Sequence, residues 1–146
     1  MKEVYLASDH AGTFLKETII DHLRENGMIP HDLGYTGDGK ADYPDYAAIL
    51  AQNMKPVPDS FGILVCGSGI GISIAANRFP WVRAALCHDV TTAKLARQHN
   101  DANVMALGEK LIGVTTALAA VDAFLATKFE AGRHSDRVEK LSQLPQ

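Results

Sequence analysis

The sequence predicts an α/β fold in which a five-stranded parallel sheet lies between two layers of helices. Short apolar runs alternate with longer segments of helical periodicity, which is typical of repeated strand–helix units. Polar and reactive residues follow several of the expected strands, at the edge where such sheets bind ligands. Together these observations indicate a three-layer α/β/α sandwich of Rossmann-like type, with residues 1–146 forming one domain.

Composition indicates a soluble globular protein and gives no reason to expect a nucleic acid or a membrane as partner. Hydrophobic residues make up 47% and charged residues 21% of the chain, and the net charge is −3. The first residues contain too short an apolar run for a secretory signal, which favours a cytoplasmic location. In that reducing compartment we expect Cys66 and Cys87 to be free thiols.

The first half of the chain contains three of the expected strands. Residues 4–7 form the first, and a helix with apolar residues four apart follows and ends at Gly27, which suits a C-terminal cap. Residues 28–33 form a second strand, which Pro30 confines to an edge. A helix begins at residues 42–44 and ends before Pro56. Its inner face comprises Ala47, Leu50, Ala51 and Met54. Residues 62–65 form the third strand.

The second half continues the alternation. We expect the glycine-rich loop after Cys66 to open a helix, followed by a strand over 83–87, a helix over about 91–99 and a strand over 104–107. Thr115 or Thr116 is the predicted cap of a helix that ends near residue 127. A last helix covers about 135–144.

The segment "CGSGIGISIAAN" places Cys66 before a glycine-rich turn that opens a helix. It lacks the third glycine of a dinucleotide fingerprint, although Asp89 lies about twenty residues on, where a ribose-binding carboxylate belongs. The lysine of a P-loop and the arginine of a cysteine phosphatase loop are also missing. What remains is a turn whose amides can hold an anion beside a thiol that the helix start favours as thiolate. That pair suits proton abstraction next to a carbonyl, and the alternative is a buried strand-end cysteine.

Three further groups have a functional and a purely structural interpretation. Asp9 could orient the imidazole of His10, or it could cap a helix. The segment His99-Asn100 could act on a substrate, or it could cap the end of its helix. Arg133 and Arg137 are four residues apart, so they could bind a phosphate together or form a solvated face.

A metal site is the weakest of the candidates. His88 and Asp89 could join Asp9 and His10 around an ion, but no spacing typical of metal ligands supports this. We therefore predict no metal and no cofactor. We expect Cys87 in the core, and Phe79 and Trp81 in packing or a subunit contact.

Five segments resemble the type B ribose-5-phosphate isomerases, a family that includes galactose-6-phosphate isomerase subunits. They are "SDHAG" (8–12), "DYPDYA" (42–47), "CGSGIGISIAANR" (66–78), "RQHNDANV" (97–104) and "EAGRHSDRV" (130–138). The resemblance implies an aldose–ketose isomerase of the pentose phosphate pathway, which interconverts ribose 5-phosphate and ribulose 5-phosphate through a cis-enediolate.

The resemblance also implies a role for each matching residue. Cys66 would be the base, Ser68 would move the hydroxyl proton, and His99 with Asp9 would open the furanose ring. The substrate-binding residues, two of which also have these catalytic roles, would be Asp9, His10, Tyr43, Gly67, Ser68, Gly69, Ile70, Gly71, Asn100, Lys110, Arg133 and Arg137. The implied assembly is a homodimer, or a dimer of dimers, in which two subunits share each site.

Two positions depart from the family pattern, and three other functions stay open. Position 68 is Ser where Thr is also common, and position 110 is Lys where Arg often binds the phosphate. The substrate could instead be galactose 6-phosphate, allose 6-phosphate or a tetrulose phosphate. A non-catalytic phosphate-binding domain and a metal-dependent isomerase are the other two possibilities.

Overall fold

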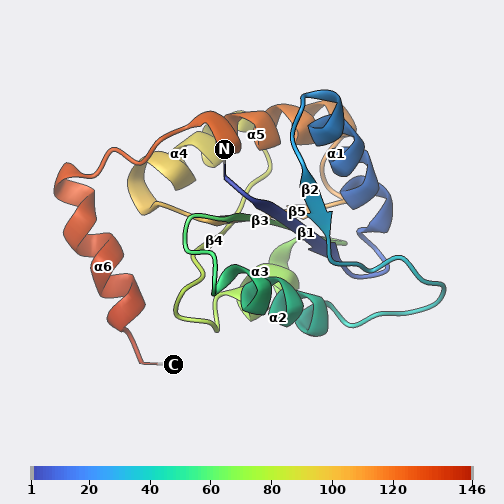
Figure 1. Ribbon diagram of the computed structural model, residues 1–146, viewed down its shortest axis with the longest axis horizontal. Helices are drawn as coiled ribbons and strands as arrows, with labels where there is room; N and C mark the ends of the chain where they lie inside the picture. The colour runs from blue at the N-terminus through green and yellow to red at the C-terminus, as the bar shows by residue number, and fades with distance from the viewer. Residues whose placement is uncertain (1, 146) are drawn as a thin grey trace.

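The computed structural model describes residues 2–145, and a parallel sheet lies at its centre (Figure 1). The strands are β1 (Val4–Ser8), β2 (Pro30–Asp32), β3 (Phe61–Cys66), β4 (Ala84–Leu86) and β5 (Val104–Gly108). All neighbours are parallel, in the order β2-β1-β3-β5-β4. The predicted five-stranded parallel sheet is therefore confirmed.

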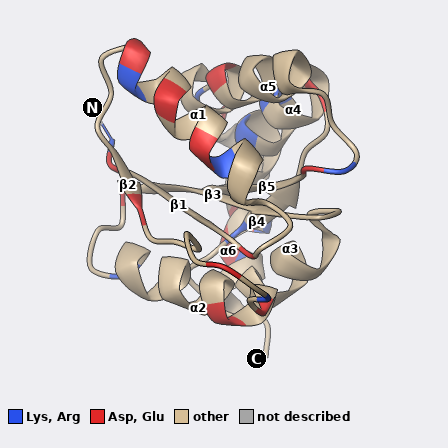
Figure 2. Ribbon diagram, turned by 90° about the vertical axis from the view of Figure 1, so that its right-hand side faces the viewer, with Lys and Arg blue, Asp and Glu red and all other residues tan. Residues whose placement is uncertain are grey.

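Helices cover both faces of the sheet, as the three-layer prediction requires. Figure 2 shows α1 (Thr13–Glu25), α4 (Val90–Asn100) and α5 (Val114–Ala126) on one face, with α2 (Tyr43–Met54) and α3 (Ile70–Ala76) on the other. Each face has its own buried apolar cluster, one around Ile19, Met105 and Phe124 and one around Leu50, Leu64 and Ile72. Acidic and basic residues are interspersed along α1.

The C-terminal segment stands beside these layers. After α5 the chain forms a short 3-10 helix, η1 (Gly132–His134), and then α6 (Ser135–Gln143). Figure 1 shows α6 projecting along one side of the molecule, and none of its residues is buried. Among residues 2–145, no helix is both long and apolar enough to cross a bilayer.

Three of the differences between predicted and observed element boundaries follow from particular hydrogen bonds. The helix predicted to begin at a threonine cap begins at Val114, because Gly113 provides the extended cap residue and its carbonyl accepts from the Ala117 amide at 2.9 Å. Strand β4 is shorter than predicted, since the Arg83 amide bonds to the Asn103 side chain instead. Strand β2 begins late because the Met28 amide closes the end of α1.

Two local predictions, one from a proline and one from a glycine, are confirmed. Pro30 lies on an edge strand, where its missing amide hydrogen costs no sheet bond on the open side. Gly27 follows the end of α1 with a φ of +79°. Its amide and that of Met28 bond back to Arg24 and Leu23, which is the double closure of a Schellman motif.

Candidate active site

A cleft opens at the carboxyl ends of β1 and β3, where the chain connections diverge. The connection from β1 leads to β2 at one edge of the sheet, and that from β3 leads to β4 at the other. Ligands of open α/β sheets bind at such a switch point. The cleft has a volume of about 580 Å³ and is lined by Asp9, Ala11, Tyr43, Cys66, Gly67, Ser68, Ile70, Gly71, Lys110 and Leu111. The sequence predicted all of these except Ala11 and Leu111.

Cys66 ends the fully buried strand β3 and presents its sulfur to the glycine turn. The strand holds it rigidly, since every residue of β3 is buried. Its Sγ atom accepts a hydrogen bond from the Gly69 amide at 3.1 Å. The thiol and the amides of the turn therefore meet at one wall of the cleft, as expected from their spacing.

The turn after Cys66 requires glycine at one position for two reasons. Gly69 has a φ of +77°, a region that residues with a Cβ adopt only at a cost. A Cβ there would also lie 2.6 Å from the Leu86 side chain and 2.9 Å from the Leu107 carbonyl carbon. In the same turn the Ser68 hydroxyl accepts from the Ile70 amide at 3.2 Å. The hydroxyl is thereby fixed near the start of α3.

The loop after β5 forms a second wall and carries the cation of the cleft. The Lys110 amide donates to the Gly67 carbonyl at 3.0 Å, which ties the two loops together. Lys110 is the one cationic side chain among the described residues that line the cleft. The Tyr43 ring also lines the cleft and packs so close to Gly71 that a Cβ there would approach it to 2.7 Å.

Asp9 is available for chemistry because another residue caps the helix that follows it. The N-cap of α1 is Gly12, and the Leu15 amide in the first turn donates to the Glu109 carboxylate at 2.7 Å. The interpretation of Asp9 as a cap of α1 is therefore wrong. Its own carboxylate accepts from the Ala11 amide at 2.9 Å and is buried beside Cys66 along the cleft.

His10 lies just outside the residues that line the cleft. It is exposed, and its Nδ1 atom lies 3.0 Å from the backbone of Ala41. This contact joins the start of α1 to the segment that precedes α2. The ring is thus fixed at the rim, next to Asp9.

The other predicted residues lie toward the opposite end of the strands, near the start of β5. His99 and Asn100 end α4, just before β5 begins. Val104 at that start pairs with Gly62, whereas Cys66 pairs with Gly108. The two ends of this strand pair are separated by about 13 Å at the usual rise of a β-strand. Arg133 and Arg137 belong to η1 and α6 and are exposed. A single chain therefore does not bring these four residues to Cys66.

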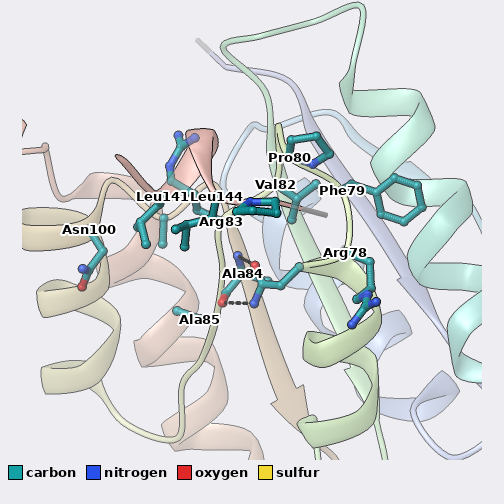
Figure 3. A pocket seen from close by; sticks show the side chains of 13 residues that line it. Arg78, Phe79, Pro80, Val82, Arg83, Ala84, Ala85, Asn100, Leu141 and Leu144 are labelled. Atoms are coloured by element: carbon teal, nitrogen blue, oxygen red, sulfur yellow. Dashed lines mark hydrogen bonds between the residues drawn. The ribbon is translucent and has the colours of Figure 1, made fainter. Parts of the chain in front are cut away.

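A second hollow, of about 530 Å³, lies between α6 and the edge of the sheet at β4 (Figure 3). Of the predicted site residues it contains Asn100 alone, with Leu141 of α6 and Leu144, just after that helix, along one side. Asn77 supports its floor through two hydrogen bonds to the Ala84 backbone, at 2.9 and 2.8 Å. The described residues that line it include no carboxylate, imidazole or thiol, so its wall offers no group for acid–base chemistry.

Asp89 and His88 do not form the sites that their sequence position allowed. The Asp89 carboxylate caps α4, accepting from the Thr92 amide at 2.7 Å, and this bond lowers the pKa of Asp89. That role disfavours the dinucleotide interpretation. Within the described part of the chain, one group of possible metal ligands comes together, and it contains His99, Glu130 and His134 rather than His88.

Two buried residues of the core complete the picture. Cys87 is buried and burial raises the pKa of its thiol to about 11, so it is an inert core residue, as expected.

Lys16, which the sequence analysis overlooked, is 0% exposed. Its ammonium donates to Asp32 at 2.7 Å and to the Tyr35 carbonyl at 3.1 Å, which fixes the segment after β2. Its position four residues before the buried Ile20 was the available signal.

Comparison with known proteins decides the family. A family model described as Ribose/Galactose Isomerase matches residues 4–141. The chain belongs to the ribose/galactose isomerase family. Ribose-5-phosphate isomerase B of Escherichia coli is 42% identical over 146 residues, covering 100% of this chain and 98% of that protein. The predicted isomerase class is thereby confirmed.

Solved structures agree with this assignment. A crystal structure of a ribose 5-phosphate isomerase from Thermotoga maritima matches with a TM-score of 0.95 and 43% identity, covering 98% of this chain and 99% of that one. Ribose-5-phosphate isomerase B from Mycoplasma genitalium, determined with bound ribulose-5-phosphate, matches with a TM-score of 0.92 and 40% identity, covering 97% and 95%. The three-layer fold is thus shared with family members over nearly the whole chain.

Proposed function

We propose that this chain interconverts ribose 5-phosphate and ribulose 5-phosphate, with Cys66 as the base. The observation that carries the proposal is the contact between the Cys66 sulfur and the Gly69 amide, 3.1 Å apart, in a cleft that also holds Asp9 and Ser68. A thiolate beside a row of amide donors suits proton transfer next to a carbonyl, because the same amides hold the oxyanion that forms.

In the isomerisation step, the Cys66 thiolate takes the proton from C2 of the open-chain aldose. The electrons of that C–H bond form the C1–C2 double bond, and the carbonyl oxygen O1 becomes an oxyanion held by amides of the turn. Ser68 moves the hydroxyl proton from O2 to O1. The thiol then returns its proton to C1, which leaves the ketone at C2. Every proton removed is returned, so no cofactor or co-reactant is needed.

The remaining predicted residues would prepare the substrate for this step. His99, assisted by Asp9, would open the furanose ring. His10, Arg133 and Arg137, with Lys110 at the cleft, would hold the phosphate, since guanidinium groups bind phosphate oxygens in pairs. Tyr43 and Asn100 would position the sugar chain.

We further propose that each site is shared between two copies of the chain. Among the described residues that line the cleft, Lys110 is the one cation, and a single positive charge is too little to balance a phosphate dianion. The two arginines and His99 lie toward the amino end of β5, where they cannot reach the Cys66 of their own chain. The molecule also exposes large apolar side chains, among them Ile74, Leu86, Leu95 and Leu141, which suits a subunit contact.

The deciding experiment measures conversion of ribose 5-phosphate in excess EDTA by wild type, Cys66→Ala and Cys87→Ala. Cys66→Ala should fall by about a hundredfold or more, which is the size expected for the loss of a positioned base. Cys87→Ala is the matched control: it removes the other thiol, from the core, and should keep its turnover.

Each contrary outcome has a definite meaning. A fully active Cys66→Ala variant overturns Cys66 as the base. If wild type is inert with ribose 5-phosphate but converts galactose 6-phosphate, allose 6-phosphate or a tetrulose phosphate, the mechanism stands and the substrate changes. If activity returns only when a divalent metal is added back, the metal-independent mechanism is wrong.

A further inference from the structure

The end of α4 and the 3-10 helix η1 bring two imidazole rings face to face. The centroids of His99 and His134 are 4.5 Å apart, and the ring planes differ by 15°. His134 is 8% exposed and lies 3.9 Å from the Glu130 carboxylate through its Nε2 atom. His99 has a proposed role in ring opening, whereas neither His134 nor Glu130 has any role so far.

The backbone of this segment is built to hold His134 against His99. The Glu130 amide donates to the Gln98 carbonyl at 3.0 Å, which ties the segment after α5 to the last turn of α4. Ala131 then adopts a φ of +57°, a backbone conformation that residues with a Cβ rarely adopt. The His134 amide donates to the Ala131 carbonyl at 3.1 Å and starts η1. The surrounding contacts therefore fix a conformation that the local sequence disfavours.

A shared metal ion is a poor explanation for this cluster. The side chains of His99, His134 and Glu130 are of ligating types, and their ligand atoms lie within 4.8 Å of one another. However, an imidazole binds a metal in the plane of its ring, and these two planes are nearly parallel and stacked. Their nitrogen lone pairs therefore do not converge on one point. The adjacent Arg133 and the nearby Arg137 would also repel a cation.

We propose that His134 is a positioning residue that holds the His99 ring in the orientation needed to open the substrate's furanose ring. The inference rests on the proposed role of His99. A ring packed face to face removes the rotational freedom of its neighbour, and correct orientation of a catalytic group accounts for a large part of its rate enhancement. Glu130 in turn contacts the edge of His134 and belongs to the same support.

The electrostatic surroundings of His134 suit this support. Burial lowers the pKa of His134 first, and the neighbouring His99, Arg133 and Arg137 lower it further, while Glu130 raises it. These surroundings favour the neutral form of the His134 ring. A neutral aromatic face packs against His99 in either protonation state, since an imidazolium is attracted by an aromatic face. The support thus persists while His99 gains and loses a proton.

The test compares His134→Ala, His134→Phe and the control His22→Ala, which removes a partly exposed histidine paired with Asp122. For conversion of ribose 5-phosphate, His134→Ala should lower kcat by about tenfold or more, because His99 loses its orientation. His134→Phe retains the flat face and should recover most of that loss. KM should change little in both, since neither touches the phosphate.

A second readout separates positioning from damage to the fold. Ribulose 5-phosphate cannot form a furanose ring, because the phosphate occupies the oxygen that would close it. Exchange of a C1 hydrogen of ribulose 5-phosphate with D2O therefore needs the base Cys66 but no ring opening. His134→Ala should keep wild-type exchange, followed by NMR, while its conversion of ribose 5-phosphate falls.

Three results would overturn the inference: unchanged conversion by His134→Ala, an equal loss of exchange and conversion, or a His134→Phe variant no better than His134→Ala. These outcomes differ from failure of the proposed function. If wild type shows neither conversion nor exchange, the function itself is wrong and the role of His134 falls with it.

Discussion

The residues around Cys66 and those around His99 belong to one proposed mechanism but are held in opposite ways. Cys66 ends a fully buried strand between two other buried strands, and the turn after it packs against β4 and β5. Asn100, Arg133 and Arg137 are exposed, and α6 has no buried residue. One half of the proposed site is thus preorganised by a single chain. The other half is presented outward, where a second subunit would meet it.

The strongest test of a site divided between two subunits is to combine two inactive variants. Cys66→Ala and His99→Ala, combined so that subunits exchange, should regain about a quarter of wild-type activity, because half of the dimers are mixed and each holds one intact site. Turnover of ribose 5-phosphate after co-expression with two affinity tags measures this. Cys66→Ala combined with Ser68→Ala is the control, since both change the same wall and no intact site forms. No recovery in the first mixture would contradict a shared site.

Removal of the His99 imidazole should separate ring opening from isomerisation. His99→Ala should slow the conversion of furanose ribose 5-phosphate by about a hundredfold, the usual contribution of an acid–base group. An acyclic substrate bypasses ring opening and should be affected much less. Paired rate measurements on a cyclic and an acyclic sugar phosphate check this. Equal losses on both would show that ring opening is not the task of His99.

The arginine on α6 should contribute to binding more than to chemistry. Arg137→Ala should raise KM for ribose 5-phosphate by about tenfold with little change in kcat, because a charge-assisted bond to phosphate is made equally in the ground and transition states. Arg24→Ala, an exposed arginine in the last turn of α1, is the matched control. An unchanged KM in Arg137→Ala would count against the phosphate role.

The last comparison concerns stability and takes one glycine from each region. Gly69 and Gly132 have φ values of +77° and +56°, but a Cβ at Gly132 would meet no atom within 4 Å. Gly132→Ala should cost about 1 kcal/mol of unfolding free energy, from backbone strain alone. Gly69→Ala adds a clash with Leu86 and the β5 backbone and should cost about 3 kcal/mol or more. Urea denaturation gives both values, and equal costs would contradict the contrast in rigidity.

The sequence predicted much of the fold because the strongest signals are local. Alternation of apolar strands with helical periods indicated the parallel sheet, Pro30 indicated an edge, and Gly27 marked the end of α1. The threonine cap of α5 was predicted wrongly, because Gly113 provides the extended cap residue and side-chain capping does not occur there. Local capping preferences are small enough for one backbone conformation to override them.

Contacts between distant segments could not be predicted in the same way. Glu109 caps the first turn of α1 from 94 residues away, and this frees Asp9 from the capping role that sequence alone allowed. Lys16 is buried because Asp32 and the Tyr35 carbonyl meet its ammonium inside the fold. The stacking of His134 on His99 depends on how the segment after α5 returns to α4. None of these pairings has a fixed spacing in the chain.

By itself the sequence determined the class of fold, the cysteine at the mouth of a glycine turn and the polar residues that follow the strands. These depend on side-chain periodicity and on which residues tolerate a given backbone conformation. Only the tertiary structure decided the strand order, and with it the divergence of the connections after β1 and β3 at the cleft beside Cys66. The reason is physical: strand order follows from how whole helices pack against the sheet. That packing is the sum of many weak contacts between distant residues, and no short segment of the sequence determines it.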